Sequence, residues 1–357
     1  MKKSFCASCL LFLLLCLVSL PACARESLPK AGLEGWAPDS PSLASLLQYV
    51  ERSTDETSEG YIPPEDRIAV FDMDGTLLGE RFPTYFNDCL FIYRALYDPD
   101  FEAPEDLKAF ARAWEDKVLR GIPIEDFDAK ERELGPRLYE GLTPDAYAEV
   151  VRRFKALPAR GFSGMTYGEA YFQPMLSLVR YLAEQGYTLY IVSATYRDAV
   201  RVMAEGTLDP YIPADRIIGT DLLYVASGDP DQNSMFHDFT PEDQLVIAGR
   251  LWVKNQKSNK VTSIQREIGK IPVLAFGNST GDFAMATYTL QNPRYEGRAY
   301  MLLCDDTLRD YGDLKVAETF RRKCEDNGFY TISERDEFTL LYPEGVTLTE
   351  REEDKAA

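Results

Sequence analysis

The sequence predicts an α/β protein built on a doubly wound parallel sheet, with a helical cap inserted after the first strand. Three observations carry this prediction. Short apolar runs that fit buried strands alternate with stretches whose apolar residues recur at helical spacing. Several of these runs end directly in polar clusters, as strands that feed a ligand site do. An aromatic-rich stretch of helical character separates the first apolar run from the second.

The N-terminal part is expected to lie outside the sheet. Lys2 and Lys3 precede an apolar run over residues 10–20, which predicts a secretory signal peptide over residues 1–22. The sequence Leu20-Pro21-Ala22-Cys23 resembles a bacterial lipobox and predicts acylation of Cys23. The expected protein is therefore an exported, membrane-anchored lipoprotein facing the periplasm or cell surface, with a soluble periplasmic protein as the alternative. Residues 23–60 are expected to form a tether with a short helix over 42–52.

The sheet and its covering helices are expected in two blocks, residues 61–80 and 174–345. Strands are expected at 68–71, 187–192, 216–219, 272–276 and 298–303. Helices are expected at 174–185, at 261–268 and at 313–327, and another is expected after Thr195 up to about residue 205. Residues 220–256 contain an acidic loop between two apolar runs that favour a hairpin, and residues 346–357 form a charged tail.

The segment between the two blocks, residues 81–173, is expected to be the helical cap. Aromatic side chains are dense here, and prolines divide the segment into short helices. We expect the aromatic residues to form the core of the cap rather than a substrate box. Tyr85 and Phe86 are the expected exceptions, because they lie nearest in sequence to the acids that end the first strand.

Composition excludes several classes of function. The chain has 39 basic and 58 acidic side chains, and without Lys2 and Lys3 its net charge is about −21. Such a surface repels nucleic acid and slightly favours cationic or zwitterionic substrates. The single histidine, His237, lies in a polar and acidic loop that does not suit a serine–histidine triad, and one histidine is too few for a multi-histidine zinc site. Cys89, Cys304 and Cys324 remain after the signal and Cys23, an odd number that does not indicate a disulfide framework, although a bridge between the last two stays open.

Polar side chains follow three of the predicted strands, where the carboxyl ends of parallel strands meet in one crevice. They are Asp72 and Asp74, Ser193, and Asn278 with Asp282. Lys260 begins the helix before the fourth strand and can reach the same crevice. Each residue also has a plainer interpretation: Asp-x-Asp-Gly occurs in surface turns and calcium loops, Ser193 fits a strand end, and Asp282 fits a helix cap.

These groups together suit phosphoryl transfer. Asp72 is the expected nucleophile, and Asp74 the expected acid and base for the leaving alcohol and the attacking water. The Asp72 and Asp282 carboxylates and the Asp74 backbone carbonyl are the expected Mg²⁺ ligands. Ser193 and Lys260 are expected to bind the phosphoryl oxygens. The sequence leaves open whether Lys260 or one of two neighbours, Lys254 and Lys257, has this role.

Asp72-Met73-Asp74-Gly75-Thr76, Ser193, Lys260 and Gly277-Asn278-Ser279-Thr280-Gly281-Asp282 resemble the four motifs of the haloacid dehalogenase superfamily. The resemblance implies a Rossmann-like fold with a cap after the first strand, and a Mg²⁺-dependent phosphatase with an aspartyl-phosphate intermediate. The last motif and Asn259-Lys260-Val261 are similar to a bacterial branch of exported, phosphoserine-phosphatase-like hydrolases. The last motif often begins Gly-Asp, whereas here Asn278 is neutral, which leaves Asp282 as its main carboxylate. Thr76 of the first motif, Asn278 and Arg201 are second-tier site candidates.

The expected function is an exported phosphomonoesterase that acts on a small phosphorylated metabolite. The acidic surface and the aromatic-rich cap favour phosphocholine or phosphoethanolamine as substrate, because aromatic faces bind quaternary ammonium groups. A phosphotransferase of the same fold is the nearest alternative. The other is a surface lipoprotein that binds a partner without turnover.

Overall fold

The computed structural model describes residues 33–79, 85–229, 232 and 235–349 of the 357-residue chain. The predicted signal peptide, Cys23 and the last eight residues of the predicted tail lie outside the described residues. No helix within the described ranges is long and apolar enough to span a bilayer.

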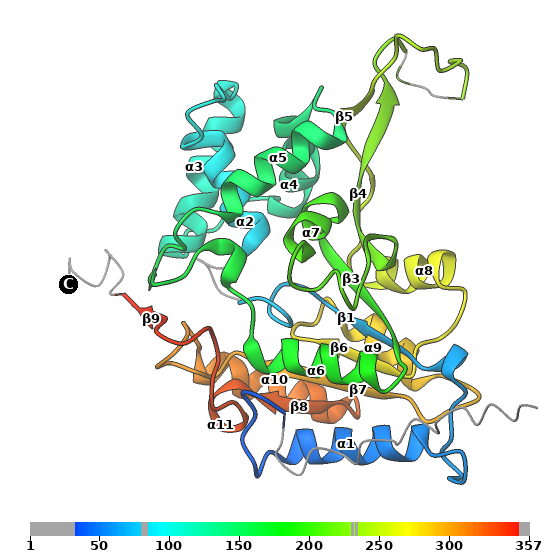
Figure 1. The fold of residues 1–357 in the computed structure, drawn as a ribbon. Coiled ribbons are helices and arrows are strands. Elements are labelled where there is room, and N and C mark those ends of the chain that lie inside the picture. Colours follow the sequence, from blue (N-terminus) through cyan, green and yellow to red (C-terminus); the bar gives the residue numbers. More distant parts are fainter. Residues whose placement is uncertain (1–32, 80–84, 230–231, 233–234, 350–357) are drawn as a thin grey trace, which may run out of the picture. The chain divides into compact units, whose positions relative to one another are not determined.

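The described residues form a sheet of seven strands in the order β5-β4-β3-β1-β6-β7-β8 (Figure 1). The strands are β1 (Ile68–Phe71), β3 (Thr188–Tyr196), β4 (Ile217–Ala226), β5 (Leu245–Val253), β6 (Leu274–Gly277), β7 (Arg298–Leu303) and β8 (Tyr330–Ser333). All neighbours pair in parallel except β4 and β5, which form an antiparallel hairpin. Because β1 lies in the middle and the chain passes from it to either side, its carboxyl end is the switch point where such sheets bind ligands.

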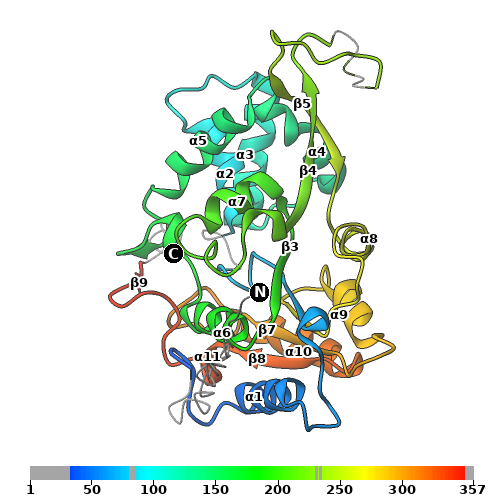
Figure 2. The ribbon, with the colours of Figure 1, turned by 45° about the vertical axis from the view of Figure 1, so that its right-hand side comes forward.

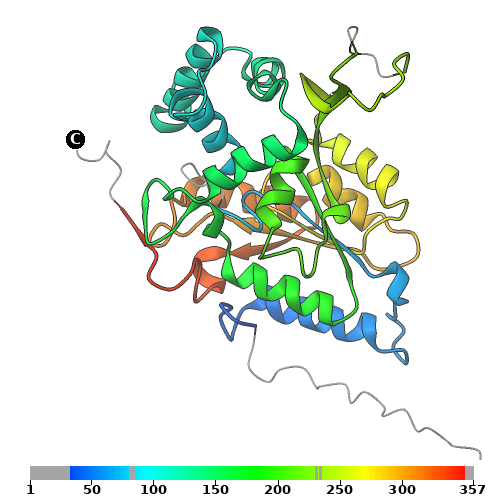
Figure 3. The same cartoon turned by 45° about the horizontal axis from the view of Figure 1, so that its top comes forward.

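Helices cover both faces of the sheet, because successive side chains of a strand point to opposite faces. Ala69 and Phe71 of β1 belong to one buried cluster, and Ile68 and Val70 belong to another. The first cluster includes apolar residues of α1 (Pro41–Thr54) and α6 (Gln173–Glu184), which run side by side below the sheet (Figures 1 and 3). The second includes residues of α8 (Ser258–Glu267), α9 (Phe283–Leu290) and α10 (Leu314–Asp326). The predicted doubly wound α/β fold is thus confirmed.

A row of stacked aromatic rings holds four parallel strands in register. Phe71, Phe276, Tyr300 and Tyr330 are paired neighbours on β1, β6, β7 and β8. Their ring centroids are 4.4, 5.6 and 5.0 Å apart, and the ring planes differ by at most 20°. Such cross-strand pairs add to the burial energy of the rings and fix which residues end each strand. The row therefore aligns the carboxyl ends of β1 and β6, where the predicted acids begin.

The expected helical segment lies between β1 and α6. Its helices are α2 (Phe86–Leu96), α3 (Glu105–Arg120), α4 (Phe127–Leu134) and α5 (Pro144–Lys155), of which α2, α3 and α5 lie together in Figure 2. Phe91, Phe110 and Trp114 are buried, with ring centroids 4.8–5.6 Å apart. This aromatic cluster is the core of the segment, as expected. After α5, β2 (Phe162–Ser163) pairs with β9 (Thr347–Leu348) from the start of the predicted tail.

The structure departs from the expected elements in a few places. Part of the expected tether is packed before the helix begins, because Trp36 is buried and forms a β-bridge with Phe338. Strand β8 was not predicted, and α7 (Arg197–Ala204) and α11 (Glu334–Glu337) complete the helices of the described residues. The hairpin expected between residues 220 and 256 is present as β4 and β5. Cys304 and Cys324 are both buried and are not joined by a disulfide.

Candidate active site

The two acids of the first motif lie at the switch point of the sheet. Asp72 directly follows β1, and its backbone N–H continues the sheet by donating to the Phe276 carbonyl at 2.9 Å. The chain then turns sharply at Gly75, whose φ of +78° favours glycine over residues with a side chain. Asp72 and Asp74 expose only 8% and 4% of their surface to solvent, so both acids are buried.

A buried lysine joins the first and the last motif. Lys260 of α8 places Nζ 2.7 Å from Asp72 Oδ1 and 2.6 Å from Asp282 Oδ1, with 2% of its side chain exposed. The two lysines that the sequence left as alternatives lie elsewhere. Lys254 pairs with Glu131 of α4 at 2.6 Å, and Lys257 is exposed. Of the three lysines, Lys260 is therefore the one that the fold brings to the acids.

Asp282 closes the loop of the last motif. Its Oδ2 accepts from the backbone N–H groups of Asn278 and Ser279, each at 3.1 Å. Gly277 makes this loop possible, since a Cβ at this position would lie 2.6 Å from Asp282 Cβ. Both Asp282 oxygens thus have donors from the protein, Lys260 on one and the loop on the other. In this arrangement Asp282 holds Lys260 and the loop in place.

Asn278, a second-tier candidate, lies closer to the first motif than its neighbours in the loop. One end of its side-chain amide is 3.0 Å from the Asp74 carbonyl oxygen and 3.2 Å from Asp72 Oδ2. If the amide nitrogen occupies this end, it donates to both oxygens. If the amide oxygen occupies it, the oxygens of Asn278, Asp72 and the Asp74 carbonyl converge. Oxygens that bind Mg²⁺ at about 2.1 Å in octahedral geometry lie about 3 Å from one another. The residues present therefore fit a Mg²⁺ ion held by Asp72, the Asp74 carbonyl and Asn278.

Asp74 has a hydrogen-bond donor on each carboxylate oxygen. Thr195 Oγ1 donates to Oδ2 at 2.7 Å, and the backbone N–H of Phe86, the first residue of α2, donates to Oδ1 at 3.2 Å. The sequence did not single out Thr195, although it lies only two residues after Ser193. Thr195 connects the second motif to the acid of the first.

The other predicted residues differ in their distance from the acids. Ser193 is fully buried, and its Oγ accepts from the Thr195 N–H at 3.0 Å. Asn255, which the sequence also did not indicate, donates to the Ser193 carbonyl at 2.9 Å and so holds the backbone of β3 at Ser193. Thr76 is buried, and its hydroxyl has no partner among the described residues. Arg201 pairs with Asp198 at 3.0 Å and donates to the Ala214 carbonyl, so it lies in the surface role that was its alternative.

Burial and charge shift the acids in a direction that suits acid catalysis. Burial and the nearby Asp282 raise the pKa of Asp72 to about 7, although Lys260 opposes this shift. Burial also raises the pKa of Asp74, against the donors from Thr195 and Phe86. Burial by itself would lower the pKa of Lys260, but Asp282 and Asp72 raise it above its ordinary value. The site thus combines a charged lysine with two acids whose pKa values burial raises, and a raised pKa suits the expected role of Asp74 as the acid.

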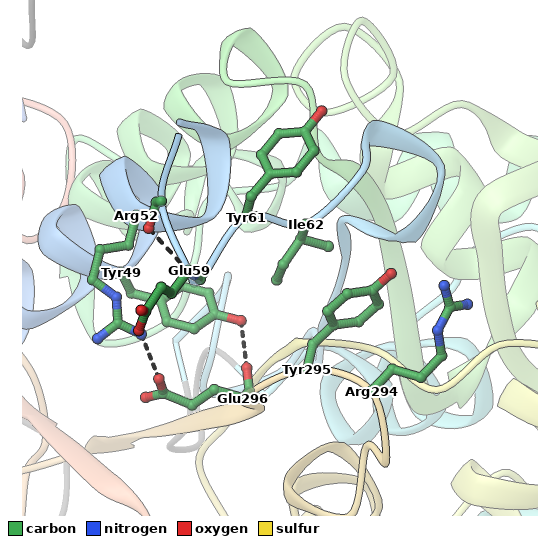
Figure 4. Close-up of a pocket in the computed structure, with 10 residues that line it drawn as sticks. Tyr49, Arg52, Glu59, Tyr61, Ile62, Arg294, Tyr295 and Glu296 are labelled. Atoms are coloured by element: carbon green, nitrogen blue, oxygen red, sulfur yellow. Dashed lines mark hydrogen bonds and ion pairs between the residues drawn. The ribbon is translucent and has the colours of Figure 1, made fainter. Parts of the chain in front are cut away.

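A separate cavity of about 560 Å³ does not belong to this site. Figure 4 shows Tyr61, Tyr295 and Arg294 around it, with Arg52 paired to Glu296. It lies beside residues that precede β1 and β7, at the amino ends of the strands. Its cations are already matched by acids, since Arg294 pairs with Asp66 at 3.1 Å. The acids at the carboxyl ends, and not this cavity, make the candidate active site.

A family model described as haloacid dehalogenase-like hydrolase matches residues 69–287, which include all four motifs. No curated protein matches the chain.

Solved structures resemble the chain at low identity. A conserved functionally unknown protein from Anaerococcus prevotii DSM 20548 has 17% identity and a TM-score of 0.49, over 82% of this chain and 91% of that one. Cytosolic 5'-nucleotidase IIIB bound to cytidine has 13% identity and a TM-score of 0.49, over 84% and 88%. A phosphoserine phosphohydrolase-like protein from Francisella tularensis subsp. tularensis SCHU S4 has 15% identity and a TM-score of 0.37, over 74% and 94%.

Proposed function

Because the chain belongs to the haloacid dehalogenase-like hydrolases and is a hydrolase of phosphate esters, we propose that it is a Mg²⁺-dependent phosphomonoesterase that works through an aspartyl phosphate. The observation that carries this proposal is the buried triangle of Asp72, Lys260 and Asp282, with oxygen–nitrogen distances of 2.7 and 2.6 Å. It supports the proposal because a carboxylate and a cation lie together at the switch point of the sheet, where both could contact a phosphoryl group.

In the first half-reaction a carboxylate oxygen of Asp72 attacks phosphorus as the bond to the leaving oxygen breaks. Asp74 gives its proton to that leaving oxygen, so the product departs as a neutral alcohol. Thr195 and the Phe86 N–H hold the Asp74 carboxyl in one orientation for this transfer. In the second half-reaction Asp74 takes a proton from water, and the water oxygen attacks the phosphorus of the aspartyl phosphate. Asp72 and inorganic phosphate are released.

The remaining residues balance charge. Lys260 lies against Asp72 and offsets the negative charge that a phosphoryl group adds there, while Asp282 keeps the lysine in place. We propose that Asp72, the Asp74 carbonyl and Asn278 hold Mg²⁺. Asp282 would position these ligands, because it binds Lys260 and the backbone N–H of Asn278. The bound ion would reduce the repulsion between the carboxylate nucleophile and an anionic substrate. Ser193 is proposed to bind a phosphoryl oxygen after its hydroxyl turns from the Thr195 N–H.

The test is phosphate release by the purified protein from a panel of phosphate monoesters, with Mg²⁺ or with a chelator. Asp72→Asn keeps the size of the side chain and should lower turnover by about 10³-fold or more, because an amide cannot serve as the nucleophile. Asp215→Asn changes an exposed aspartate and is the matched control. Equal activity in Asp72→Asn would exclude the mechanism. Products formed with added alcohols would distinguish a transferase from a hydrolase.

We propose phosphocholine or phosphoethanolamine as the substrate class. The net charge of −19 favours a leaving group that carries a positive charge. We expect kcat/KM for phosphoethanolamine to exceed that for glycerol phosphate by tenfold or more. A preference for the uncharged glycerol ester would contradict this assignment.

We also propose that the protein is exported and acylated at Cys23. The support is the charged, apolar and small-residue pattern of residues 1–22. Incorporation of labelled palmitate in cells should be lost in Cys23→Ser. Undiminished labelling of that variant would exclude Cys23 as the lipid site.

A further inference from the structure

A second cavity, of about 400 Å³, lies in the helical segment between α2 and the chain that follows α5. Its volume is within the range of pockets that bind small molecules. Aromatic side chains provide most of its wall: Tyr93 and Tyr97 of α2, Phe154 of α5, and Tyr167. Ile92 and Cys89 of α2 add apolar surface. The nine residues that line it all belong to the described part of the chain.

Three of these rings form a continuous series. Tyr93 and Phe154 have centroids 5.3 Å apart with planes inclined by 37°, and Phe154 and Tyr167 have centroids 4.4 Å apart with planes inclined by 24°. These are the separations of offset-stacked aromatic pairs. Since a series of ring faces and edges around a cavity complements another flat ring, the lining favours an aromatic ligand over a branched aliphatic one.

The charges at the rim are matched within the protein. Arg160 pairs with Glu115 at 2.9 Å, and Tyr97 donates its hydroxyl to the same carboxylate at 2.9–3.0 Å. A charged ligand would have to compete with this pair, whereas an uncharged ring leaves it undisturbed. The rim therefore favours a neutral ligand, with hydrogen-bonding groups of its own at most.

The wall of the cavity is in direct contact with the residue that binds Asp74. Phe86 packs its ring edge-on against Phe154, with centroids 5.2 Å apart. The backbone N–H of the same Phe86 donates to Asp74 Oδ1 at 3.2 Å. Phe86 and the cavity-lining Cys89 are three residues apart on α2, so they are less than one helical turn from each other. A ligand that shifts Phe154 or α2 changes the donor on Asp74.

We propose that this cavity is a binding site for a small uncharged aromatic molecule, and that its occupancy acts on Asp74 through Phe86. The binding part stands on the cavity itself. The effect on turnover rests on the proposed phosphatase function, so the two parts have separate measurements.

Binding is tested with indole, a neutral molecule with one flat ring system, on protein labelled with ¹³C at isoleucine δ1 methyl groups. The Ile92 resonance, assigned by its loss in Ile92→Leu, should shift in a saturable manner, while Ile62, which lines the cavity of Figure 4, should not. Tyr97→Ala removes one aromatic wall at a position that is 56% exposed and should weaken indole binding threefold to tenfold. Phe236→Ala removes an aromatic side chain that is 81% exposed elsewhere and should change nothing.

No saturable shift at Ile92, or equal affinity in Tyr97→Ala and the unaltered protein, would overturn the site. The link to Asp74 is measured in two ways: by the Phe86 amide ¹⁵N resonance, and by phosphate release from phosphoethanolamine at saturating indole. We expect the Phe86 resonance to move together with Ile92 and kcat to change at least twofold. A moving Ile92 with a stationary Phe86 amide would overturn the link whether or not the protein is a phosphatase. A moving Phe86 amide with unchanged kcat would overturn its effect on turnover.

Discussion

Replacing Lys260 with methionine tests how the buried charges are balanced. Methionine keeps most of the length and apolar character of the lysine stem but removes the ammonium group. At an effective dielectric constant of about 20, each contact of Nζ with Asp72 or Asp282, at 2.7 and 2.6 Å, is worth about 6 kcal/mol. Desolvation of the three ions cancels much of this gain. Breaking such a buried pair costs about 3–5 kcal/mol in measured cases, because it leaves the partner charges buried.

The size of this loss should depend on pH in a defined direction. The pKa of Asp72 is already about 7 with the lysine present, and it rises further without it. A carboxyl group whose pKa is higher in the folded protein stabilises the fold most below its unfolded pKa, and this contribution is lost as pH rises. We therefore expect Lys260→Met to lose about 3–5 kcal/mol at pH 8 and about 1–2 kcal/mol at pH 5, where Asp72 can take up a proton.

The assay is urea unfolding of both proteins at pH 5 and pH 8 with a chelator present, so that a metal ion cannot replace the lysine. Lys257→Met, three residues earlier and exposed, is the matched control and should change stability by less than about 0.5 kcal/mol. A loss below about 1 kcal/mol at pH 8 would refute the reasoning. So would a larger loss at pH 5 than at pH 8.

Three further changes test other parts of the site. Thr195→Val removes the 2.7 Å donor to Asp74 and should lower kcat by about 10- to 100-fold with little change in KM. Thr319→Val, at an exposed position of α10 outside the motifs, should have no effect, and steady-state phosphate release measures both. Asn278→Asp adds a charged oxygen beside Asp72 and the Asp74 carbonyl, and should lower the Mg²⁺ concentration for half-maximal activity about tenfold; an unchanged value would exclude Asn278 from the metal site. Asp88→Asn removes a carboxyl group whose pKa burial raises to about 7. The variant should be more stable than the unaltered protein by about 4 kcal/mol at pH 8 and nearly equal to it at pH 4, as measured by urea unfolding. A constant difference between these pH values would contradict this.

The sequence was sufficient for the parts of the fold that local pattern decides. Strand β1 could be located because four apolar residues directly precede two acids, and the structure has the strand at these four residues. The other motif strands could be recognised in the same way, because each apolar run stops at a polar cluster. The β4–β5 hairpin followed from two apolar runs around an acidic loop. Strand β8 was missed because four residues, only half of them deeply buried, carry too short a pattern.

The tertiary structure alone decided which side chains meet. Lys254, Lys257 and Lys260 lie within seven residues of one another, and only the packing of α8 against the sheet brings the last of them to Asp72, 188 residues away in the chain. The same is true of Thr195, whose contact with Asp74 joins segments 121 residues apart in sequence. The tertiary structure also decided the different contacts of two residues in the last motif. Asp282 binds Lys260 and the loop backbone, whereas the Asn278 amide contacts oxygens of the first motif. The sequence by itself determined the acids and the strands that present them, because hydrophobic periodicity and turn chemistry are local. Which donor faces which acid depends on the packing of distant elements, and local pattern does not contain that information.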